Sequence, residues 1–578
     1  MKREPYPLRQ WMEETHSTAF ELRRHFFLRF FDSDLVSTPG QWRVVVAGAI
    51  AVLLSLSFIW IPAYYHKYLL LNELDSAEPL RHAFLADVLF LIALAMCIIG
   101  LFTTLLWTSL FPALRDYLAL AGLPIRPRDI FAAKFAALLS LAGAFVVAVT
   151  LPTSVFLPML AAGHNAPGIA PQIPGIFVSS SLAALFVFFS LVALQGVLLN
   201  VLTANLFARV SLLFQGALLM MLLCSLPFVF SIAGLQQAMT QRPEWLVWAP
   251  PAWFLGLDQV IAGNRELLAT RLAWLSLAGV TGSAAAAVLT YAWSYRRHRI
   301  RVLESAAAAT KTRRNRLAAL ADKMVPRELA VFAFIAKTLA RSRQHRLILT
   351  AYAALAVAMI VESFVSLVFT RNFRGFSVQT PALRQAAISA PLALSLFVLA
   401  GFRYLFRLPV ELRANWVFQV NAPGNRLFFL AAVERFLIYC AVIPVALLTL
   451  PLEIRLLGAG DGLIATLLCA LPSLVLMELL LLQFERVPFT SSYLPGRRPL
   501  VQTLLIYLFS VTLYVSILGA LFAAALHSLV GMPIVFALLV AAWWRVRTAR
   551  LQDREMGRIE FEETLEPAVL TLSIERDS

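Results

Sequence analysis

Long runs of apolar residues, separated by short polar or charged stretches, recur along the whole chain. A helix needs about 20 apolar residues to cross the roughly 30 Å hydrocarbon core of a bilayer, so each run predicts a membrane span. Twelve runs are candidates, of which the eighth and the twelfth are the shortest. They cover residues 44–64, 86–111, 130–151, 176–199, 210–235, 272–293, 347–369, 386–402, 427–450, 463–482, 500–525 and 529–544. The pattern predicts an all-α, polytopic membrane protein with about twelve transmembrane helices.

Composition supports this interpretation. The chain has 578 residues, of which 60% are hydrophobic and 14% charged, whereas soluble domains average about 45–50% apolar and about 25% charged residues. The mean hydropathy is +0.76. Little room is left for a large soluble catalytic domain.

The distribution of basic residues predicts the orientation. Lys and Arg number 49 and Asp and Glu 33, a net charge of +16. With both termini in the cytoplasm, the cytoplasmic segments hold 38 of the basic residues and the external loops nine, as the positive-inside rule requires. The external loop at 370–385, with three arginines, is an exception. Because few aromatic residues are interleaved with the basic ones, nucleic acid is not an expected partner. We expect a multi-pass protein of the plasma (inner) membrane.

The spans divide the chain into five parts. We expect a cytoplasmic amphipathic segment, a first six-helix half, a basic cytoplasmic linker with a second amphipathic segment, a second six-helix half and a cytoplasmic tail, at residues 1–43, 44–293, 294–346, 347–544 and 545–578. The linker carries 14 basic residues against three acidic ones. Such a stretch is attracted to anionic lipid at the inner leaflet.

Matching residues in the two halves suggest an internal duplication. At a constant offset of 299, Pro124 corresponds to Pro423, and Thr-Leu-Pro at 150–152 corresponds to the same tripeptide at 449–451. Because six spans is an even number, both halves would have the same orientation, with a pathway between them. Chance matches among apolar segments are the alternative.

Catalytic motifs are absent from the sequence. No GxxxxGK[ST] loop is present to bind nucleotide phosphates, and no HExxH pair to bind zinc. The four cysteines fall inside apolar runs, where they are expected to pack in the interior rather than form disulfides. The chain is not expected to be an enzyme or to hold a cofactor, so energy would come from a partner or an ion gradient.

Two cytoplasmic connections combine charge with aromatic residues. They lie between spans two and three and between spans eight and nine, at 112–129 and 403–426. In the first, a short helix over 114–120 can present an apolar face and a charged face. Simple turns with interfacial aromatic residues are the alternative. The candidate docking residues are Arg115, Asp116, Tyr117, Arg126, Arg128, Asp129, Glu411, Arg413, Asn415, Trp416 and Arg426.

The first connection resembles the cytoplasmic loop of exporter-type permeases of the ATP-binding cassette superfamily, second class. The similar residues are Leu118–Ile125 and Ile130–Lys134, and Pro250–Leu257 is similar to a short external motif of that family. The resemblance implies that each six-helix half is one permease unit, and that the connections dock two copies of a separate ATPase, which would hold ATP and Mg. It implies export, with a lipophilic or amphipathic substrate as one expectation.

The chain departs from that family's pattern in three ways. The halves are fused, no ATPase is attached, and the second half has only a stub, Leu526–Pro533, where the first has its Trp-Phe motif. The stub leaves open whether the two halves function symmetrically.

Polar residues inside the spans are candidates for a translocation path, because such residues are costly in lipid and usually face protein. Glu434 is followed by Arg435, and the pair could neutralise each other or point to different helices. Structural hydrogen bonds between helices are the alternative role for all of these residues. The candidate path residues are Gln195, Glu362, Glu434 and Glu478.

Two other classes of protein are considered. A secondary, ion-gradient-driven transporter of the major facilitator type also has two six-span halves joined by a basic loop. Its Gly-x-x-x-Asp-Arg-x-Gly-Arg-Arg pattern is not reproduced at 120–129. A membrane scaffold or a lipid-modifying enzyme is a third class, but the sequence contains no candidate catalytic dyad.

Overall fold

The computed structural model describes most of the chain in two compact units, Met1–Lys311 and Thr312–Ser578. The described residues are 20–27, 61–73, 77–111, 126–162, 169–230, 247–307, 326–370, 381–408, 427–482, 487–490, 509–526 and 530–556, with isolated positions at 48, 51, 54–55, 410, 418, 420, 506 and 528. These residues form helices and contain no strand. The expected all-α class is confirmed for the described part of the chain.

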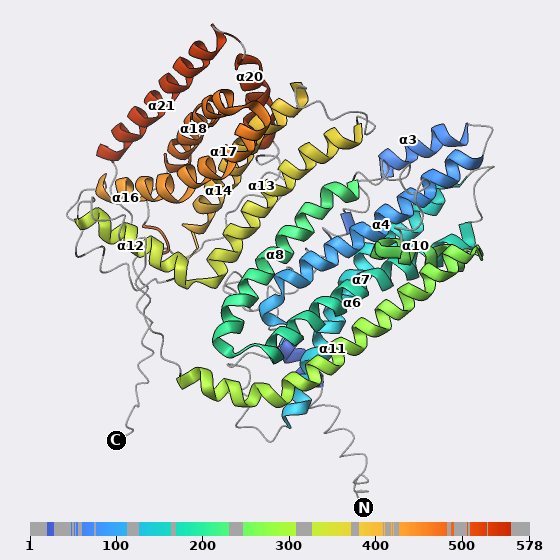
Figure 1. The fold of residues 1–578 in the computed structure, drawn as a ribbon. Helices are drawn as coiled ribbons and strands as arrows, with labels where there is room; N and C mark the ends of the chain where they lie inside the picture. Colours follow the sequence, from blue (N-terminus) through green and yellow to red (C-terminus); the bar gives the residue numbers. More distant parts are fainter. Residues whose placement is uncertain are drawn as a thin grey trace, which may run out of the picture. The chain divides into compact units, whose positions relative to one another are not determined.

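Unit 1 is built around α7 (Ile169–Val201), which packs against α4 (Ala77–Leu105), α6 (Pro127–Ala161), α10 (Pro250–Ile261) and α11 (Leu267–Ala307). On its other side α4 packs against α8 (Ala204–Phe230), and the short α3 (Ile61–Asn72) contacts α4 and α6. Figure 1 draws these helices in blue to green. The 3-10 turn η1 (Trp107–Ser109) follows α4.

Unit 2 has a similar pattern of helix pairs. Its first helices are α12 (Pro326–Arg341), α13 (Arg343–Thr370) and α14 (Pro381–Leu405). They are followed by α16 (Leu427–Leu437), the π-helical turn η5 (Ile438–Val442), α17 (Ile443–Leu457), α18 (Ala459–Leu481), the π-helical turn η6 (Thr512–Ile517), α20 (Leu518–Ala525) and α21 (Gly531–Met556). In this unit α18 packs against α14, α17 and α21, and α14 packs against α20 (Figure 1).

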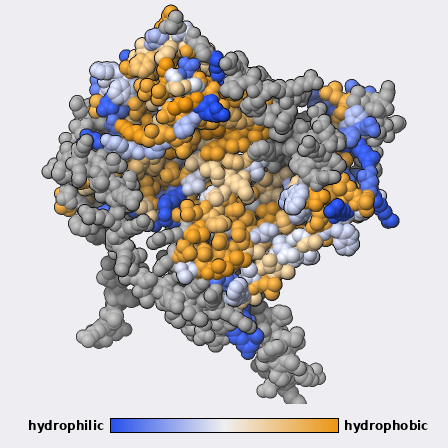
Figure 2. All heavy atoms as spheres, viewed as in Figure 1, coloured by the Kyte–Doolittle hydropathy of each residue, from blue (hydrophilic) through white to orange (hydrophobic). Residues whose placement is uncertain are grey.

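Nine of the described helices are long and apolar enough to cross a membrane. They cover 78–105, 128–161, 170–201, 267–294, 343–365, 382–405, 429–457, 459–481 and 531–552. Hydrophobic residues cover much of the described surface in Figure 2, as expected for helices whose outer faces meet lipid. On α8 and α11, for example, Leu213, Trp274 and Leu289 are more than two-thirds exposed.

The expected spans and the observed helices agree in most places. The fifth and eleventh expected spans contain shorter apolar helices, Val210–Leu226 and Phe509–Ala525. The first, at 44–64, lies mostly outside the described residues, and its last four residues belong to α3. The eighth and twelfth are longer than expected. Their helices continue through Arg384 and Arg545, because basic side chains near helix ends can extend toward the interface. The four cysteines form no disulfide, as expected.

An amphipathic helix precedes the spans of each unit. In unit 1, residues 20–27 are helical, and Leu22 and Phe26 pack against Ile130, Ala133 and Ala137 of α6. In unit 2, α12 buries Val331, Phe332, Ile335 and Ala336 in the core cluster to which α16 contributes. Both expected amphipathic segments therefore contain a helix that packs on its own unit.

Candidate functional site: a buried charge cluster in unit 2

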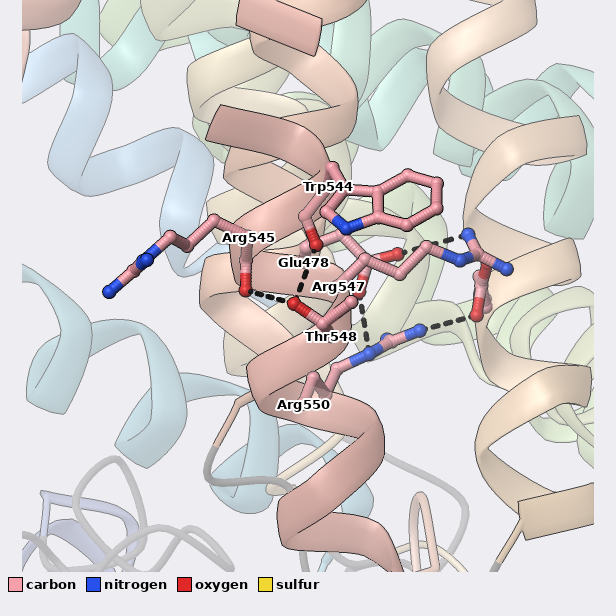
Figure 3. A network of polar contacts seen from close by, with 7 residues as sticks. Glu478, Trp544, Arg545, Arg547, Thr548 and Arg550 are labelled. Carbon is pink, nitrogen blue, oxygen red and sulfur yellow. Dashed lines mark hydrogen bonds and ion pairs between the residues drawn. The ribbon is translucent and has the colours of Figure 1, made fainter. Parts of the chain in front are cut away.

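Four charged side chains meet between three helices of unit 2, and we call them the charge cluster. Glu434 comes from α16, Glu478 from α18, and Arg547 and Arg550 from α21. Figure 3 labels Glu478 and the two arginines. The two arginines are three residues apart, so they lie on one face of α21. Figure 3 shows Arg545 directed away from this face.

Both arginines bridge both glutamates. Arg547 Nη1 lies 2.9 Å from Glu434 Oε1 and 3.4 Å from Glu478 Oε1. Arg550 Nε lies 2.5 Å from Glu478 Oε2, and its Nη2 pairs with Glu434 Oε2. The cluster thus ties the last third of α21 to α16 and α18.

The charge cluster is buried, most deeply around one pair. The Glu478 and Arg550 side chains are 0% and 1% exposed, whereas that of Arg547 is 37% exposed. Arg547 also lies over the Trp543 ring, with its Cζ 5.0 Å from the ring centroid. Two carboxylates and two guanidinium groups sum to no net charge, which lowers the desolvation penalty that single charges would incur here.

Arg435, next to Glu434 in sequence, belongs to a different contact. It pairs with Glu328 of α12. Of the two alternatives for Glu434 and Arg435, the structure therefore shows the second: the two side chains point to different helices. Because α12 lies beside α16, the charge cluster is at the α12 end of the unit.

The same end of unit 2 holds a short aromatic junction. Phe489 is buried with a φ of 67°, a conformation that is uncommon for a non-glycine residue. Its N–H donates to the Phe406 carbonyl (3.2 Å) and its carbonyl accepts from the Val410 N–H (3.0 Å). The His345 ring of α13 packs edge-on against it. This junction fixes the end of α14, from which the second expected docking connection begins.

Most of the expected docking residues lie outside the described residues. The exceptions are Arg126, Arg128 and Asp129, which are exposed around the first turn of α6. Arg128 and Asp129 form a surface ion pair of 3.6 Å. The residues outside the described part are Arg115, Asp116, Tyr117, Glu411, Arg413, Asn415, Trp416 and Arg426.

The expected path residues do not form one group. Glu434 and Glu478 meet in the charge cluster, whereas Glu362 is exposed on α13. Gln195 is buried in unit 1, where its Nε2 donates to the Trp107 carbonyl (2.6 Å). The Trp107 Nε1 in turn donates to Ser211 Oγ (2.8 Å), so Gln195 contributes to a bond network that joins α7, η1 and α8.

No family model, curated protein or solved structure matches the chain. Its function must therefore be argued from its own residues.

The cationic half of the charge cluster was not predicted from the sequence. Arg547 and Arg550 lie at the end of the last apolar run and look like ordinary interfacial arginines. A usable signal was present: two glutamates in separate apolar runs require cationic partners, and two arginines spaced by three residues present one cationic face.

Unit 1 holds a second buried acidic site that the sequence analysis also missed. Asp87 of α4 accepts from Lys67 Nζ (2.7 Å) and from the Tyr68 hydroxyl (2.6 Å) of α3. Burial, and secondly the Asp87 carboxylate, raise the pKa of Tyr68 well above its usual range, so Tyr68 keeps the proton that it donates. The contact fastens α3 to α4.

Asp258 of α10 is buried without such partners. It is 1% exposed, and its Oδ1 has no hydrogen-bond partner among the described residues. Burial raises its pKa from an ordinary 3.8 to about 7. A Cβ at Gly175 of α7 would lie 2.7 Å from Oδ1, so α10 and α7 approach closely here because residue 175 is glycine.

Proposed function

We propose that the chain is the membrane permease of an ATP-binding cassette exporter, with two six-helix halves in one chain. It moves a lipophilic or amphipathic substrate across the plasma membrane, and a separate ATPase supplies the energy. The proposal includes twelve spans, with both termini in the cytoplasm. In it, residues 44–64 are the first span, and the apolar helices at 210–226 and 509–525 are the fifth and the eleventh.

The observation that carries the proposal is the matched position of the two amphipathic helices. Ile130, Ala133 and Ala137 of α6 receive the helix at 20–27. Their counterparts 299 residues later, Phe429, Ala432 and Phe436, lie in the apolar cluster of α16 and α12. Phe436 contacts Phe332 of α12 directly, with ring centroids 5.4 Å apart. An amphipathic helix on the cytoplasmic surface ahead of the spans is a feature that the resemblance implies.

The order of helix packing supports a duplication. In unit 1, α7 packs against α4, α6 and α11, and α4 against α8. In unit 2, α18 packs against α14, α17 and α21, and α14 against α20. In chain order, α4, α6, α7, α8 and α11 of unit 1 thus correspond to α14, α17, α18, α20 and α21 of unit 2. Pro152 and Pro451, which are 299 residues apart, both lie inside the corresponding helices α6 and α17.

The partner is two copies of an ATPase, bound at 112–129 and 403–426. Each connection follows a helix of the corresponding pair, α4 or α14. In unit 2, the aromatic junction around Phe489 supports docking at 403–426, because it fixes the end of α14 from which this connection begins. Coupling between two sites is carried by rigid elements.

Charge reversal in the connections tests the proposal. We expect Arg115→Glu, Asp116→Lys and Arg413→Glu together to abolish recovery of the ATPase, and its ATP hydrolysis, when the tagged full chain is purified from membranes. The matched control is Arg265→Glu, an exposed residue between α10 and α11. Equal ATPase recovery with the triple variant and the control would refute docking at these connections.

A secondary transporter driven by an ion gradient is the second candidate. The observation in its favour is a buried carboxyl in α17, Glu453, that pairs with no described cation. Purified chain in vesicles distinguishes the two: uptake or efflux driven by a pH gradient without ATPase supports the second candidate and contradicts the first.

A further inference from the structure

Glu453 lies inside unit 2, far from the charge cluster. It belongs to α17, about one turn before that helix ends at Gly458, and it is 0% exposed. Gly458 has a φ of 96°, which allows the chain to turn directly into α18. Glu453 therefore sits where the α17–α18 hairpin turns, whereas Glu478 lies at the other end of α18.

The carboxyl of Glu453 has one polar contact. The Thr466 hydroxyl of α18 donates to its Oε2, and its Oε1 has no hydrogen-bond partner among the described residues. Titratable or charged residues lie on the three elements packed against α17 and on α17 itself. They are Asp461, Cys469 and Glu478 on α18, Arg384, Arg403 and Tyr404 on α14, Tyr439 and Cys440 in η5, and Arg455 on α17. Among the described residues, no basic side chain forms an ion pair with Glu453.

The space around Glu453 restricts what it can bind. A Cβ at Gly462 would lie 2.8 Å from the Ile454 nitrogen, so the backbones of α17 and α18 are in direct contact beside it. The side chain of Glu453 is 0% exposed, so a hydrated metal ion or an organic cation could reach the carboxyl only if the two helices moved apart. A proton needs no cavity, and an isolated carboxyl in apolar surroundings is far less costly when neutral than when charged.

Further polar side chains lie on α18 beyond this carboxyl. Thr466, Cys469 and Ser473 are spaced by three and four residues and share one face. The Tyr514 hydroxyl of η6 lies 3.2 Å from Ser395 Oγ of α14, and the Ser473 hydroxyl donates to the Cys469 carbonyl (2.8 Å). With a rise of 1.5 Å per residue, Thr466 and Glu478 are about 18 Å apart along the helix.

We propose that Glu453 is a buried proton-binding site of unit 2, at the turn between α17 and α18. The step is reversible protonation: one carboxylate oxygen takes a proton from a hydronium ion, which becomes water, and the neutral acid later returns the proton to water. The site does not depend on the ATPase or on the proposed exporter function.

Infrared difference spectroscopy of the full chain in lipid nanodiscs tests the proposal. We expect a C=O stretching band of a protonated carboxyl near neutral pH that disappears as the pH rises. The band is absent from Glu453→Gln and retained in Glu362→Gln, the matched control with an exposed glutamate in α13. If no band between about pH 5 and about pH 9 depends on Glu453, the residue is ionised throughout and the proposal is wrong.

A second variant keeps Glu453 and changes only its partner. Thr466→Val removes the hydroxyl that stabilises the charged carboxylate, so the midpoint of the band should move to higher pH by roughly one unit. An unchanged midpoint in folded Thr466→Val would contradict the assigned contact and with it the site. Thermal unfolding of each variant in detergent shows whether it is folded.

Discussion

Glu478 and Arg550 are almost completely enclosed by protein, so the charge of each is stabilised mainly by the other. In such surroundings an ion pair contributes little net stability, whereas an unpaired charge is strongly destabilising. The charge cluster is therefore best understood as a fastening that holds α21 to α16 and α18 in one position. Its geometry favours a structural or gating role over that of a proton carrier, because each carboxylate is held by two guanidinium groups.

Glu478→Gln should destabilise the protein, because it leaves Arg550 buried with one carboxylate fewer. We expect the free energy of unfolding to fall by about 3 kcal/mol. Thermal unfolding of the purified chain in detergent measures the effect, with Glu362→Gln as the exposed control. The double variant Glu478→Gln/Arg550→Met should recover much of the loss, because it removes the unpaired charge. Equal melting temperatures of wild type and Glu478→Gln would contradict this account of the cluster.

Asp258 should make unit 1 sensitive to pH. Its pKa is about 7 in the folded protein and 3.8 when exposed to water. Between these values the folded state binds a proton that the unfolded state does not, so stability falls as the pH rises from about 4 to about 7 and then levels off. We expect a loss on the order of 4 kcal/mol across this range. Asp258→Asn should remove this part of the pH dependence, measured as melting temperature against pH; an unchanged slope would show that Asp258 is not the group responsible.

At the scale of single elements, the α17–α18 hairpin depends on two glycines with different roles. Gly458 provides the positive φ of the turn, and Gly462 allows the two helix backbones to touch. The sequence shows both glycines within a few residues of each other, but it does not show which of them is tightly packed. That depends on how the two helices are rotated against each other.

Gly462→Ala should therefore separate α17 from α18, because the added Cβ would meet backbone atoms of Ile454 that cannot move aside. We expect a destabilisation of about 1–3 kcal/mol by thermal unfolding. The matched control is Gly460→Ala in the same turn of α18, where a Cβ meets nothing within 4 Å. The control should be neutral or slightly stabilising, because alanine favours helix. Similar effects of the two substitutions would rule out the close approach at Gly462.

The limits of sequence-based prediction are clearest at helix ends and across helices. Apolar runs identified the spans well because membrane thickness sets their length. The predicted ends of α14 and α21 were too early, because each apolar run was ended at an arginine and the helix continues past it. Glu434 and Glu478 were recognisable as ionisable residues in lipid-like segments. Their partners on α21 were not, since pairing across helices depends on three-dimensional packing that one sequence does not specify.

At the scale of the whole molecule, each unit is a helical bundle with an amphipathic helix on it, and the charge distribution assigns each bundle an orientation. Ile130 and Phe429 each lie in an apolar cluster with the amphipathic helix of their own unit, as the proposed duplication predicts. The orientation is a prediction for both units and can be tested in each separately.

Accessibility of single cysteines tests the topology. In a chain without its native cysteines, Glu266→Cys between α10 and α11 should react with a membrane-impermeant maleimide in intact cells. Lys337→Cys on α12 should react only after the membrane is opened. Both positions are exposed in the structure. A cysteine that does not react in intact cells is therefore shielded by the membrane and not by burial in the protein. Labelling of Lys337→Cys in intact cells would reverse the predicted orientation of unit 2.

The central claim, that the chain is a permease powered by a separate ATPase, is tested most directly by native mass spectrometry of the full chain purified gently from its own membrane. We predict a complex of one chain with two copies of an ATP-binding subunit, dissociated by the triple charge reversal at Arg115, Asp116 and Arg413. A chain that is found alone or paired only with itself, under conditions in which it still transports, would contradict the claim.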